Sequence, residues 1–276
     1  MVEGLEIMKV GLIGFGKTGK AVAATLLRSK DTRLEWVIRR SSKLEHRSIP
    51  EFLGEESDEP GLIYSSENIT CSQLLGIHPV DIIIDFSSET GIDYYGEEAK
   101  ARNISVISAV SLYSEKQLTY LHSLAEHTKV IHSPNITLGV NFLIVAAKIL
   151  KNIAPFDDIE ILEEHFKSKP EVSGTAKVIA KNLGLSEDSI KTIRAGGIIG
   201  VHEIIFGFPY QTVRLKHESI SREAFGNGVI FAANNLPSAR SGFFSVEDLL
   251  IPYFHLNDVE KEFEKQQKKP WWRIWK

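Results

Sequence analysis

The stretch MKVGLIGFGKTG, residues 8–19, decides the fold of the first half of this chain. A short apolar run leads into three glycines with the spacing GxGxxG, and the alanine- and leucine-rich segment that follows predicts a helix. In such a strand, turn and helix, Gly14 permits the tight turn, Gly16 lets the backbone approach a pyrophosphate, and Gly19 lets the helix pack closely on the strand. We therefore expect a dinucleotide to bind here. A glycine turn with a purely structural role is the alternative.

The alternation of strand and helix continues through residue 134. The run VDIIIDF at residues 80–86 is almost continuously apolar, as expected for a strand buried on both faces of a parallel sheet. Such alternation predicts an α/β fold with a Rossmann-type doubly wound parallel sheet, in which ligands bind at the carboxyl ends of the strands. The expected strands cover residues 8–13, 34–38, 80–86, 104–109 and 128–133, and the expected helices include residues 91–102 and 115–125.

The second expected strand ends in Arg39 and Arg40, where an NAD-binding protein usually offers a carboxylate to the ribose 2′-hydroxyl. A fork of guanidinium donors suits a 2′-phosphate, whereas an acidic side chain would repel one. The sequence therefore favours NADPH as the cofactor without excluding NADH. The alternative is a solvated basic turn.

The pattern changes after residue 134, which indicates a second domain. We place the hinge within residues 134–142 and expect an apolar helix to run on to about Ile153. The alternating segment 157–166 then predicts a strand, and later segments such as 211–217 predict an open mixed sheet. The expected domains are a dinucleotide-binding domain of residues 1–134, completed by residues 242–276, and an α+β substrate-binding domain of residues 135–241.

The segment EEHFKSKPEVSGTA, which begins at Glu163, contains the side chains that can transfer a proton or bind an anion. On the expected strand, Glu163 and His165 share one face with two isoleucines, so His165 lies at a rigid strand end. Ser173 can cap a helix of residues 174–183, whose free N-terminal amides, together with Lys169, would hold a carboxylate. An imidazole and an ammonium so placed predict an anionic substrate that becomes protonated. The alternative is a polar connection between a strand and a helix.

Three further polar residues of the second half, His202, His217 and Arg222, are candidates for polar contacts. We interpret each as a structural hydrogen-bonding residue, because a single histidine or arginine in a sheet more often completes local hydrogen bonds than binds a ligand.

The composition limits the class of function. A chain of 276 residues with 43% hydrophobic and 25% charged residues can bury a sizeable core, and a net charge of −4 argues against a general nucleic-acid binder. Cys71 is the only cysteine, so an internal disulfide and a cysteine-based metal cluster are excluded and a cytoplasmic location is expected. No apolar stretch approaches the ~20 residues that span a bilayer. A small-molecule enzyme without nucleic-acid, membrane or metal partners fits best.

Several motifs, taken in order, resemble the dihydrodipicolinate reductase family of bacterial lysine biosynthesis over roughly residues 8–250. Each motif is modestly specific, but their order and spacing together are highly specific. The matching stretches are the glycine turn at 14–19, IDFSSETG at 84–91, NITLGVN at 135–141, IEILEEH at 159–165, SGTA at 173–176, RAGGIIGVHE at 194–203 and HESISREAFGNG at 217–228.

This resemblance implies an N-terminal NAD(P)H domain and a homotetramer built through the sheets of a C-terminal substrate domain. It implies that His165 and Lys169 are the catalytic pair and that Ser173, Gly174 and Thr175 bind a substrate carboxylate. The implied reaction reduces 4-hydroxy-tetrahydrodipicolinate, a cyclic imine dicarboxylate, to tetrahydrodipicolinate for diaminopimelate and lysine synthesis. The residues expected to bind the cofactor are Gly14, Phe15, Gly16, Lys17, Thr18, Gly19, Arg39, Arg40, Phe86, Ser87, Ser108, Ala109 and Asn135.

Three positions depart from the family pattern. Phe166 stands where the family has a second histidine, Val110 lies in SAVS at residues 108–111 where the family has GTTG, and Val172 replaces a proline. Phe166 and Val110 cannot hydrogen-bond a carboxylate, and each lost bond to a charged group costs about 1.5–3 kcal/mol. One alternative is therefore a paralogue that reduces a different imine, and another is an NADPH-sensing protein without catalysis.

The C-terminal segment KKPWWRIWK, residues 268–276, combines tryptophans with basic residues. Such a segment can dock on the protein's own surface or on a neighbouring subunit, and it can also contact a membrane surface or a partner protein. The sequence does not assign it to one of these.

Overall fold

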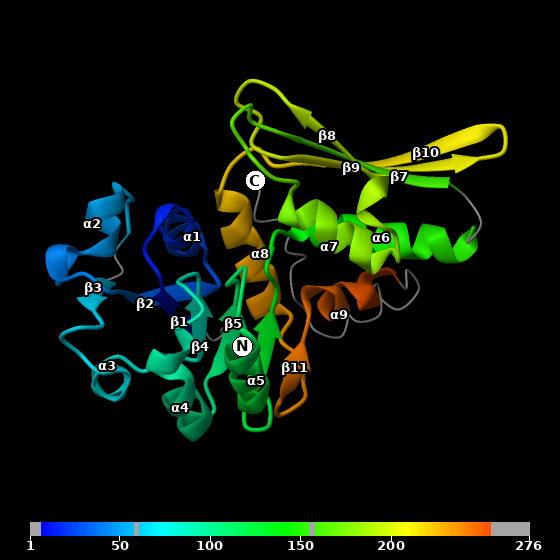
Figure 1. Ribbon diagram of the computed structural model, residues 1–276. Helices are drawn as coiled ribbons and strands as arrows, with labels where there is room; N and C mark the ends of the chain where they lie inside the picture. Colours follow the sequence, from blue (N-terminus) through cyan, green and yellow to red (C-terminus); the bar gives the residue numbers. More distant parts are fainter. Residues whose placement is uncertain (1–6, 58–60, 155–157, 255–276) are drawn as a thin grey trace, which may run out of the picture. The chain divides into compact units, whose positions relative to one another are not determined.

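The computed structural model describes residues 7–57, 61–154 and 158–254, so the tryptophan-rich segment at 268–276 lies outside the described residues. The chain divides into two compact units, the first formed by residues 1–136 with 225–276 and the second by residues 137–224. Figure 1 labels their helices and strands in chain order. We describe each unit by itself.

The first unit is built on a sheet of seven parallel strands, in the order β11-β6-β5-β4-β1-β2-β3 (Figure 1). Six of the strands follow the Rossmann order 3-2-1-4-5-6, so the predicted fold class is confirmed. The strands are β1 (Met8–Ile13), β2 (Thr32–Arg39), β3 (Leu62–Ser65), β4 (Ile82–Asp85), β5 (Ser105–Ser108), β6 (Lys129–His132) and β11 (Gly242–Phe244). The helices are α1 (Lys17–Arg28), α2 (Ile49–Leu53), α3 (Cys71–Ile77), α4 (Ile92–Arg102), α5 (Glu115–Leu124), α8 (Glu223–Asn234) and α9 (Val246–Leu250).

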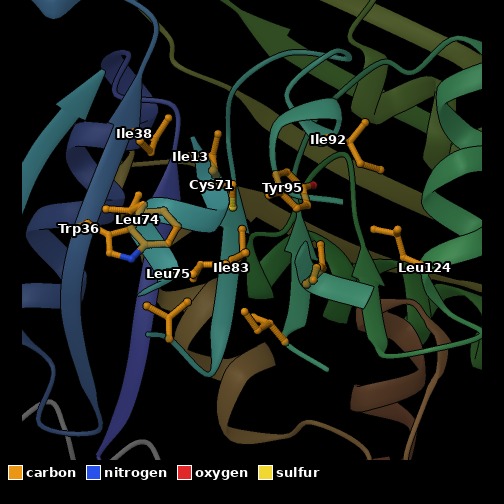
Figure 2. Close-up of a cluster of buried hydrophobic side chains, with 14 of the residues drawn as sticks. Ile13, Trp36, Ile38, Cys71, Leu74, Leu75, Ile83, Ile92, Tyr95 and Leu124 are labelled. Carbon is orange, nitrogen blue, oxygen red and sulfur yellow. The ribbon is translucent and has the colours of Figure 1, made fainter. Parts of the chain in front are cut away.

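The core of this unit forms where apolar strand residues meet the apolar faces of α3, α4 and α5 (Figure 2). Trp36 of β2 and Ile83 of β4 are fully buried there, against Leu74 of α3 and Tyr95 of α4. Side chains of this size each contribute roughly 1.5–3 kcal/mol when they leave water. This packing fixes the carboxyl ends of the strands, where the first candidate site lies.

Two parts of the sheet were not predicted from the sequence. β3 is only four residues long, and the three-residue β11 joins the edge beside β6 from more than a hundred residues further along the chain. α3 was also missed, although a capping box between Thr70 and Gln73 marks its start. Such a box is a sequence-level signal of a helix N-terminus and was available.

The second unit is a mixed sheet of four strands in the order β10-β9-β7-β8, in which only β7 and β8 run parallel. The apolar faces of two helices cover one side of this sheet and form its core with it. The predicted open mixed sheet is therefore confirmed. The elements are α6 (Leu138–Ile153), β7 (Asp158–His165), α7 (Gly174–Asn182), β8 (Ile190–Arg194), β9 (Val201–Phe208) and β10 (Gln211–Glu218).

The chain returns to the first unit within α8. Asn234 of α8 donates a hydrogen bond to Asp31, at 3.1 Å, and the ring of Phe225 meets Phe86 with centroids 6.2 Å apart. The second crossing between units thus lies after residue 224, whereas the sequence prediction placed it after residue 241. Residues 244–250 belong to the first unit as predicted.

Candidate functional site

A groove of about 630 Å³ opens at the carboxyl ends of β1, β2 and β4. Parallel sheets bind ligands at this edge, because the turns that follow the strands leave backbone amides and side chains facing outward there. Six residues predicted to bind the cofactor line the groove, namely Gly14, Phe15, Gly16, Arg39, Arg40 and Ser87.

The three glycines of the turn after β1 have different surroundings. Gly14 has a φ of +95°, and a Cβ on it would lie 2.7 Å from the backbone of Phe86. A Cβ on Gly19 would lie 2.0 Å from the carbonyl oxygen of Gly14, so the helix can pack on the turn only without a side chain there. A Cβ on Gly16 would meet no atom within 4 Å. Gly16 is therefore dispensable for the packing of the turn, and its backbone faces open space.

The two arginines of this groove have no partner in the described parts of the chain. Neither the Arg39 nor the Arg40 guanidinium forms an ion pair or hydrogen bond within the described ranges, and Arg40 is exposed. α1 begins at Lys17 without a side-chain cap, so its first amides remain available to an anion. Open backbone at Gly16, free amides and two unpaired guanidinium groups fit a phosphorylated dinucleotide.

Asp85 stands behind the groove at the end of β4. Its carboxylate is fully buried and accepts hydrogen bonds from the amide of Ser87 at 2.8 Å, the hydroxyl of Ser87 at 2.6 Å and the hydroxyl of Tyr95 at 3.1 Å. Burial raises the pKa of Asp85 to about 6, although the bonds from Ser87 and Tyr95 oppose the rise. Asp85 therefore holds the turn that carries Ser87.

The other seven residues predicted to bind the cofactor lie outside the lining of this groove. The ring of Phe15, which does line it, packs on Phe52, with centroids 5.6 Å apart. The hydroxyl of Ser108 is buried and bonded to Tyr113 at 2.7 Å. The predicted residues outside the groove lining are Lys17, Thr18, Gly19, Phe86, Ser108, Ala109 and Asn135.

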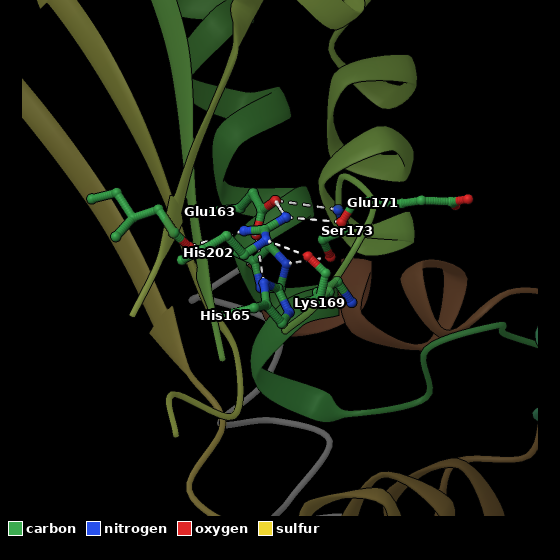
Figure 3. A network of polar contacts seen from close by, with 8 residues as sticks. Glu163, His165, Lys169, Glu171, Ser173 and His202 are labelled. Atoms are coloured by element: carbon green, nitrogen blue, oxygen red, sulfur yellow. Dashed lines mark hydrogen bonds and ion pairs between the residues drawn. The ribbon is translucent and has the colours of Figure 1, made fainter. Parts of the chain in front are cut away.

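A second site lies where β7 ends, and Figure 3 shows Glu163, His165, Ser173 and His202 clustered there, whereas the side chain of Glu171 points away. The buried positions of β7 alternate, and after Ile159 and Ile161 the same face carries Glu163 and His165, as predicted. Nδ1 of His165 lies 2.5 Å from Oε2 of Glu163. A fully buried carboxylate therefore fixes the orientation of a buried imidazole.

The charge of Glu163 is balanced by Arg194, at the end of the neighbouring strand β8. Nη1 of Arg194 donates to Oε2 of Glu163 at 3.0 Å and Nη2 donates to Oε1 at 2.5 Å. Burial alone would raise the pKa of Glu163, but hydrogen bonds from Arg194, His165 and the amide of Ser173 lower it overall. Glu163 is therefore ionised, and its oxygens act only as acceptors.

The turn from β7 to α7 carries Lys169 and Ser173. Lys169 is half-buried. Burial lowers the pKa of His165, the contact with Glu163 opposes this, and the charges of Lys169 and Arg194 lower the pKa further. The charge of Lys169 therefore acts on the imidazole of His165.

Ser173 precedes α7, but its hydroxyl does not cap the helix as predicted. Its Oγ lies 2.9 Å from Nε2 of His202, on β9, because this buried imidazole offers a closer partner than the helix amides. Ser173 therefore provides no side-chain cap to α7, which begins at Gly174. An anion at the N-terminus of α7 would be favoured by the helix dipole.

His202, interpreted from the sequence as a structural residue, is buried on β9, and its Nδ1 has no hydrogen-bond partner within the described residues. Burial, with the nearby charges of His165, His217 and Lys169, lowers the pKa of His202 to about 3. Its imidazole is thus neutral at physiological pH. It connects Ser173 to the sheet through a single hydrogen bond.

Glu163 and Arg194 were not predicted as members of the site. Glu163 had a signal, since a carboxylate on the apolar face of a strand needs a buried partner. Arg194 had no local signal, because it lies 31 positions away in the chain and reaches Glu163 only through the pairing of β7 with β8. Of the three departures noted in the sequence, Phe166 is 41% exposed, Val110 is buried, and Val172 is partly buried against the core of the second unit.

Among the described residues, no group of three or more histidine, cysteine, aspartate or glutamate side chains is placed to hold a metal ion. The described helices also include none that combines the length and apolarity needed to span a bilayer.

Comparison with known proteins gives a consistent result. The family "Dihydrodipicolinate reductase, N-terminus" matches residues 8–136, and "Dihydrodipicolinate reductase, C-terminus" matches residues 135–250. A 4-hydroxy-tetrahydrodipicolinate reductase from Caldanaerobacter subterraneus is 31% identical over 192 residues, which cover 62% of this chain and 76% of that protein. The reductase of the same name from Buchnera aphidicola is 25% identical over 276 residues, with coverage of 90% and 99%.

Solved structures show the same fold. A dipicolinate-bound dihydrodipicolinate reductase from Paenisporosarcina superposes with a TM-score of 0.73 at 20% identity, covering 87% of this chain and 98% of that chain. An amine dehydrogenase from Mycobacterium smegmatis superposes with a TM-score of 0.63 at 11% identity, covering 88% and 96%.

Proposed function

This chain belongs to the dihydrodipicolinate reductase family, and we propose that it reduces 4-hydroxy-tetrahydrodipicolinate to tetrahydrodipicolinate with NADPH, in diaminopimelate and lysine synthesis. The observation that carries the proposal is the buried His165 imidazole, which Glu163 orients and which lies near the ammonium of Lys169 and the N-terminus of α7. The reaction adds a hydride and a proton and releases the 4-hydroxyl group as water. The protein must supply a proton donor and a binding site for the substrate carboxylates.

The charges of the second site favour an anionic substrate. Arg194 and Lys169 carry two positive charges, and Glu163 supplies one negative charge, so the site has an excess of one positive charge. A bound carboxylate would offset the cations that lower the pKa of His165, and the imidazole would then hold a proton more readily. His165 is thus the general acid, and its pKa is higher when the substrate is bound than when it is absent.

Two groups hold the substrate carboxylates in this proposal. The residues at the start of α7, Ser173, Gly174 and Thr175, bind one carboxylate, which the helix dipole favours. The ammonium of Lys169 binds the second carboxylate or the ring nitrogen. Both anchors lie on the turn that His165 borders, so the substrate and the acid are held by one segment.

NADPH is the cofactor that the first site fits best. When bound, it supplies the hydride. The backbone of Gly16 and the first amides of α1 would hold its pyrophosphate, and Arg39 and Arg40 would hold its 2′-phosphate. The preference for NADPH over NADH follows from these two unpaired guanidinium groups.

Purified protein tests the proposal directly. NADPH oxidation is followed at 340 nm with freshly generated 4-hydroxy-tetrahydrodipicolinate, and Lys169→Ala serves as the comparison. We expect turnover by the wild type and a loss of both affinity and turnover in Lys169→Ala. Tight NADPH binding without oxidation, or full activity of Lys169→Ala, would refute the assignment.

A paralogous imine reductase is the second candidate, and Phe166 favours it. This ring is 41% exposed beside the catalytic histidine and cannot hydrogen-bond a carboxylate. A substrate with an apolar group in place of one carboxylate would suit it better. Parallel assays with cyclic imines that carry one carboxylate separate the two candidates through their kcat/KM ratios.

We also propose a homotetramer and a cytoplasmic location. The tetramer is implied by the family resemblance, with the sheet of β7 to β10 as its interface, and light scattering measures the mass. The location follows from the single, buried Cys71, which suits a reducing compartment.

A further inference from the structure

Arg194 uses every hydrogen-bond donor that its side chain has. Nε donates to the carbonyl of Lys169 at 3.1 Å, Nη1 to Glu163 and to the carbonyl of Ile193 at 2.9 Å, and Nη2 to Glu163 and to the carbonyl of Glu171 at 2.8 Å. Five N–H groups thus meet five acceptors, which is the full capacity of a guanidinium. Surface arginines rarely reach this state, because solvent competes for their donors.

We propose that Arg194 and Glu163 form a positioning pair, which fixes the protonated atom of His165 and the shape of the turn that carries Lys169 and Ser173. This inference rests on the proposed function, because it assigns the pair to the reductive site. It adds two residues that touch neither substrate nor cofactor and act through those that do.

The first consequence concerns the tautomer of His165. Glu163 is ionised and accepts only, so Nδ1 of His165 carries the hydrogen in their 2.5 Å contact. Nε2 is then the atom that gains and loses the catalytic proton. A Cβ on Gly200 would lie 3.1 Å from this Nε2, so the glycine leaves room beside the reactive nitrogen.

The second consequence concerns the turn between β7 and α7. Arg194 binds the carbonyls of Lys169 and Glu171, and Glu163 accepts a hydrogen bond from the amide of Ser173 at 3.3 Å. The pair therefore holds this segment at three points of its backbone. These contacts fix the positions of Lys169 and of the start of α7 relative to His165.

The third consequence concerns charge. The titratable groups that face His165 are Glu163 on its own strand, Arg194 on β8, His202 on β9 and Lys169 on the turn. Glu163 alone among them raises the pKa of His165, while Lys169 and Arg194 lower it. Loss of the Glu163 charge therefore lowers the pKa of His165 further. Activity that needs a protonated His165 would then be lost at a lower pH.

Variants of the pair test the proposal, each measured for kcat, KM and the pH dependence of kcat. Glu163→Gln keeps the shape and removes the charge, and Arg194→Lys keeps the charge and removes the five-donor fork. We expect kcat to fall about 10- to 100-fold in both, because a displaced proton donor is inefficient. In Glu163→Gln the alkaline limb of the pH profile should also move to lower pH. Arg194→Lys should raise KM as well, since the turn loses its two carbonyl contacts.

A matched pair on the same sheet provides the control. Arg214 of β10 donates to Glu203 of β9 at 2.9 Å; this pair is more exposed, and Glu203 points to the opposite face of β9 from His202. Arg214→Lys and Glu203→Gln should leave kcat and its pH profile within twofold of the wild type. A similar loss in both pairs, or an unshifted pH profile in Glu163→Gln, would show that the Arg194 pair stabilises the fold only.

A measurement without turnover separates this inference from the proposed function. ¹⁵N NMR of histidine-labelled wild-type protein reports the tautomer of His165, identified by its loss in His165→Asn, and NADPH fluorescence checks the fold of each variant. We expect hydrogen on Nδ1 at high pH in the wild type, whether or not the protein reduces the compound tested. Hydrogen on Nε2 would overturn the positioning role even if every variant were inactive or unfolded.

Discussion

The two candidate sites solve the problem of binding in opposite ways. The groove at β1, β2 and β4 presents backbone, small side chains and two arginines without partners, so its attractive groups are unused within the described chain. At the site of His165, the carboxylate of Glu163 is already paired with both an imidazole and a guanidinium. The charged groups of the first site await a ligand, whereas the groups that orient His165 are in place without one. The difference fits a cofactor that comes and goes and a proton donor whose orientation must not vary.

Replacement of the proton donor should have the largest effect and should leave the other site untouched. In His165→Asn the general acid is lost, so we expect kcat to fall about 10²- to 10⁴-fold. The dissociation constant of NADPH, measured by fluorescence titration, should stay within twofold, because no residue of the groove changes. Residual activity above a tenth of the wild type would mean that another group donates the proton.

Two glycine variants should affect the groove differently, one through stability and the other through NADPH affinity. Gly19→Ala places a Cβ 2.0 Å from the Gly14 carbonyl, so we expect a loss of about 1–3 kcal/mol in unfolding free energy through overpacking. Gly16→Ala meets no atom within 4 Å, so its stability should stay within about 0.5 kcal/mol of the wild type. Its methyl group nevertheless faces the space offered to a pyrophosphate, and NADPH affinity should fall.

Thermal unfolding and NADPH titration of both glycine variants make the distinction. Equal destabilisation of the two would show that Gly16 is structural, and unchanged NADPH affinity in Gly16→Ala would place the pyrophosphate elsewhere.

The sequence predicts the first site well because its chemistry is local. Gly14, Gly16 and Gly19 lie within one turn, and Arg39 and Arg40 end the adjacent strand, so spacing along the chain nearly determines their arrangement in space. The parallel order of the strands adds Ser87 to the same edge. What escaped prediction were short elements such as β11, whose three residues carry too little periodicity to be recognised.

The second site was predicted only in part because its geometry is not local. The alternation in β7 places Glu163 and His165 on a buried face, and that much follows from a period of two. The partner of Glu163 depends on which strand becomes its neighbour, and the pairing of β7 with β8 brings Arg194 there. Ser173 shows the same limit, since its helix-capping role was displaced by His202 from β9.

The neutral imidazole of His202 should make the protein sensitive to acid. The pKa of this group is about 3 in the folded protein and about 6.5 in an unfolded chain. Below pH 6.5 the unfolded state therefore binds a proton that the folded state does not bind. The free energy of unfolding consequently falls as the pH falls. The loss is about 1.4 kcal/mol per pH unit, or about 2 kcal/mol between pH 7 and pH 5.

Urea unfolding of the wild type and His202→Gln at pH 7 and pH 5 measures this term. The wild type should lose about 2 kcal/mol more than the variant on acidification. Asp85, whose pKa is raised to about 6, acts in the opposite direction but equally in both proteins, so it cancels from the comparison. Equal losses in the two proteins would mean that His202 is protonated in the folded state.

Replacement of Arg40 should have the smallest effect and should sharpen the contrast between an open and a prepaired site. Its guanidinium is exposed, so a contact with a 2′-phosphate is worth about 1 kcal/mol, or fivefold in affinity. Arg40→Ala should weaken NADPH binding by that factor and leave NADH binding unchanged, and the difference should shrink as salt is added. Arg47, which lies over the Phe52 ring outside the groove lining, supplies the control in Arg47→Ala. Equal losses for NADPH and NADH would show that Arg40 contacts a part that the two cofactors share, and the cofactor preference would then depend on Arg39.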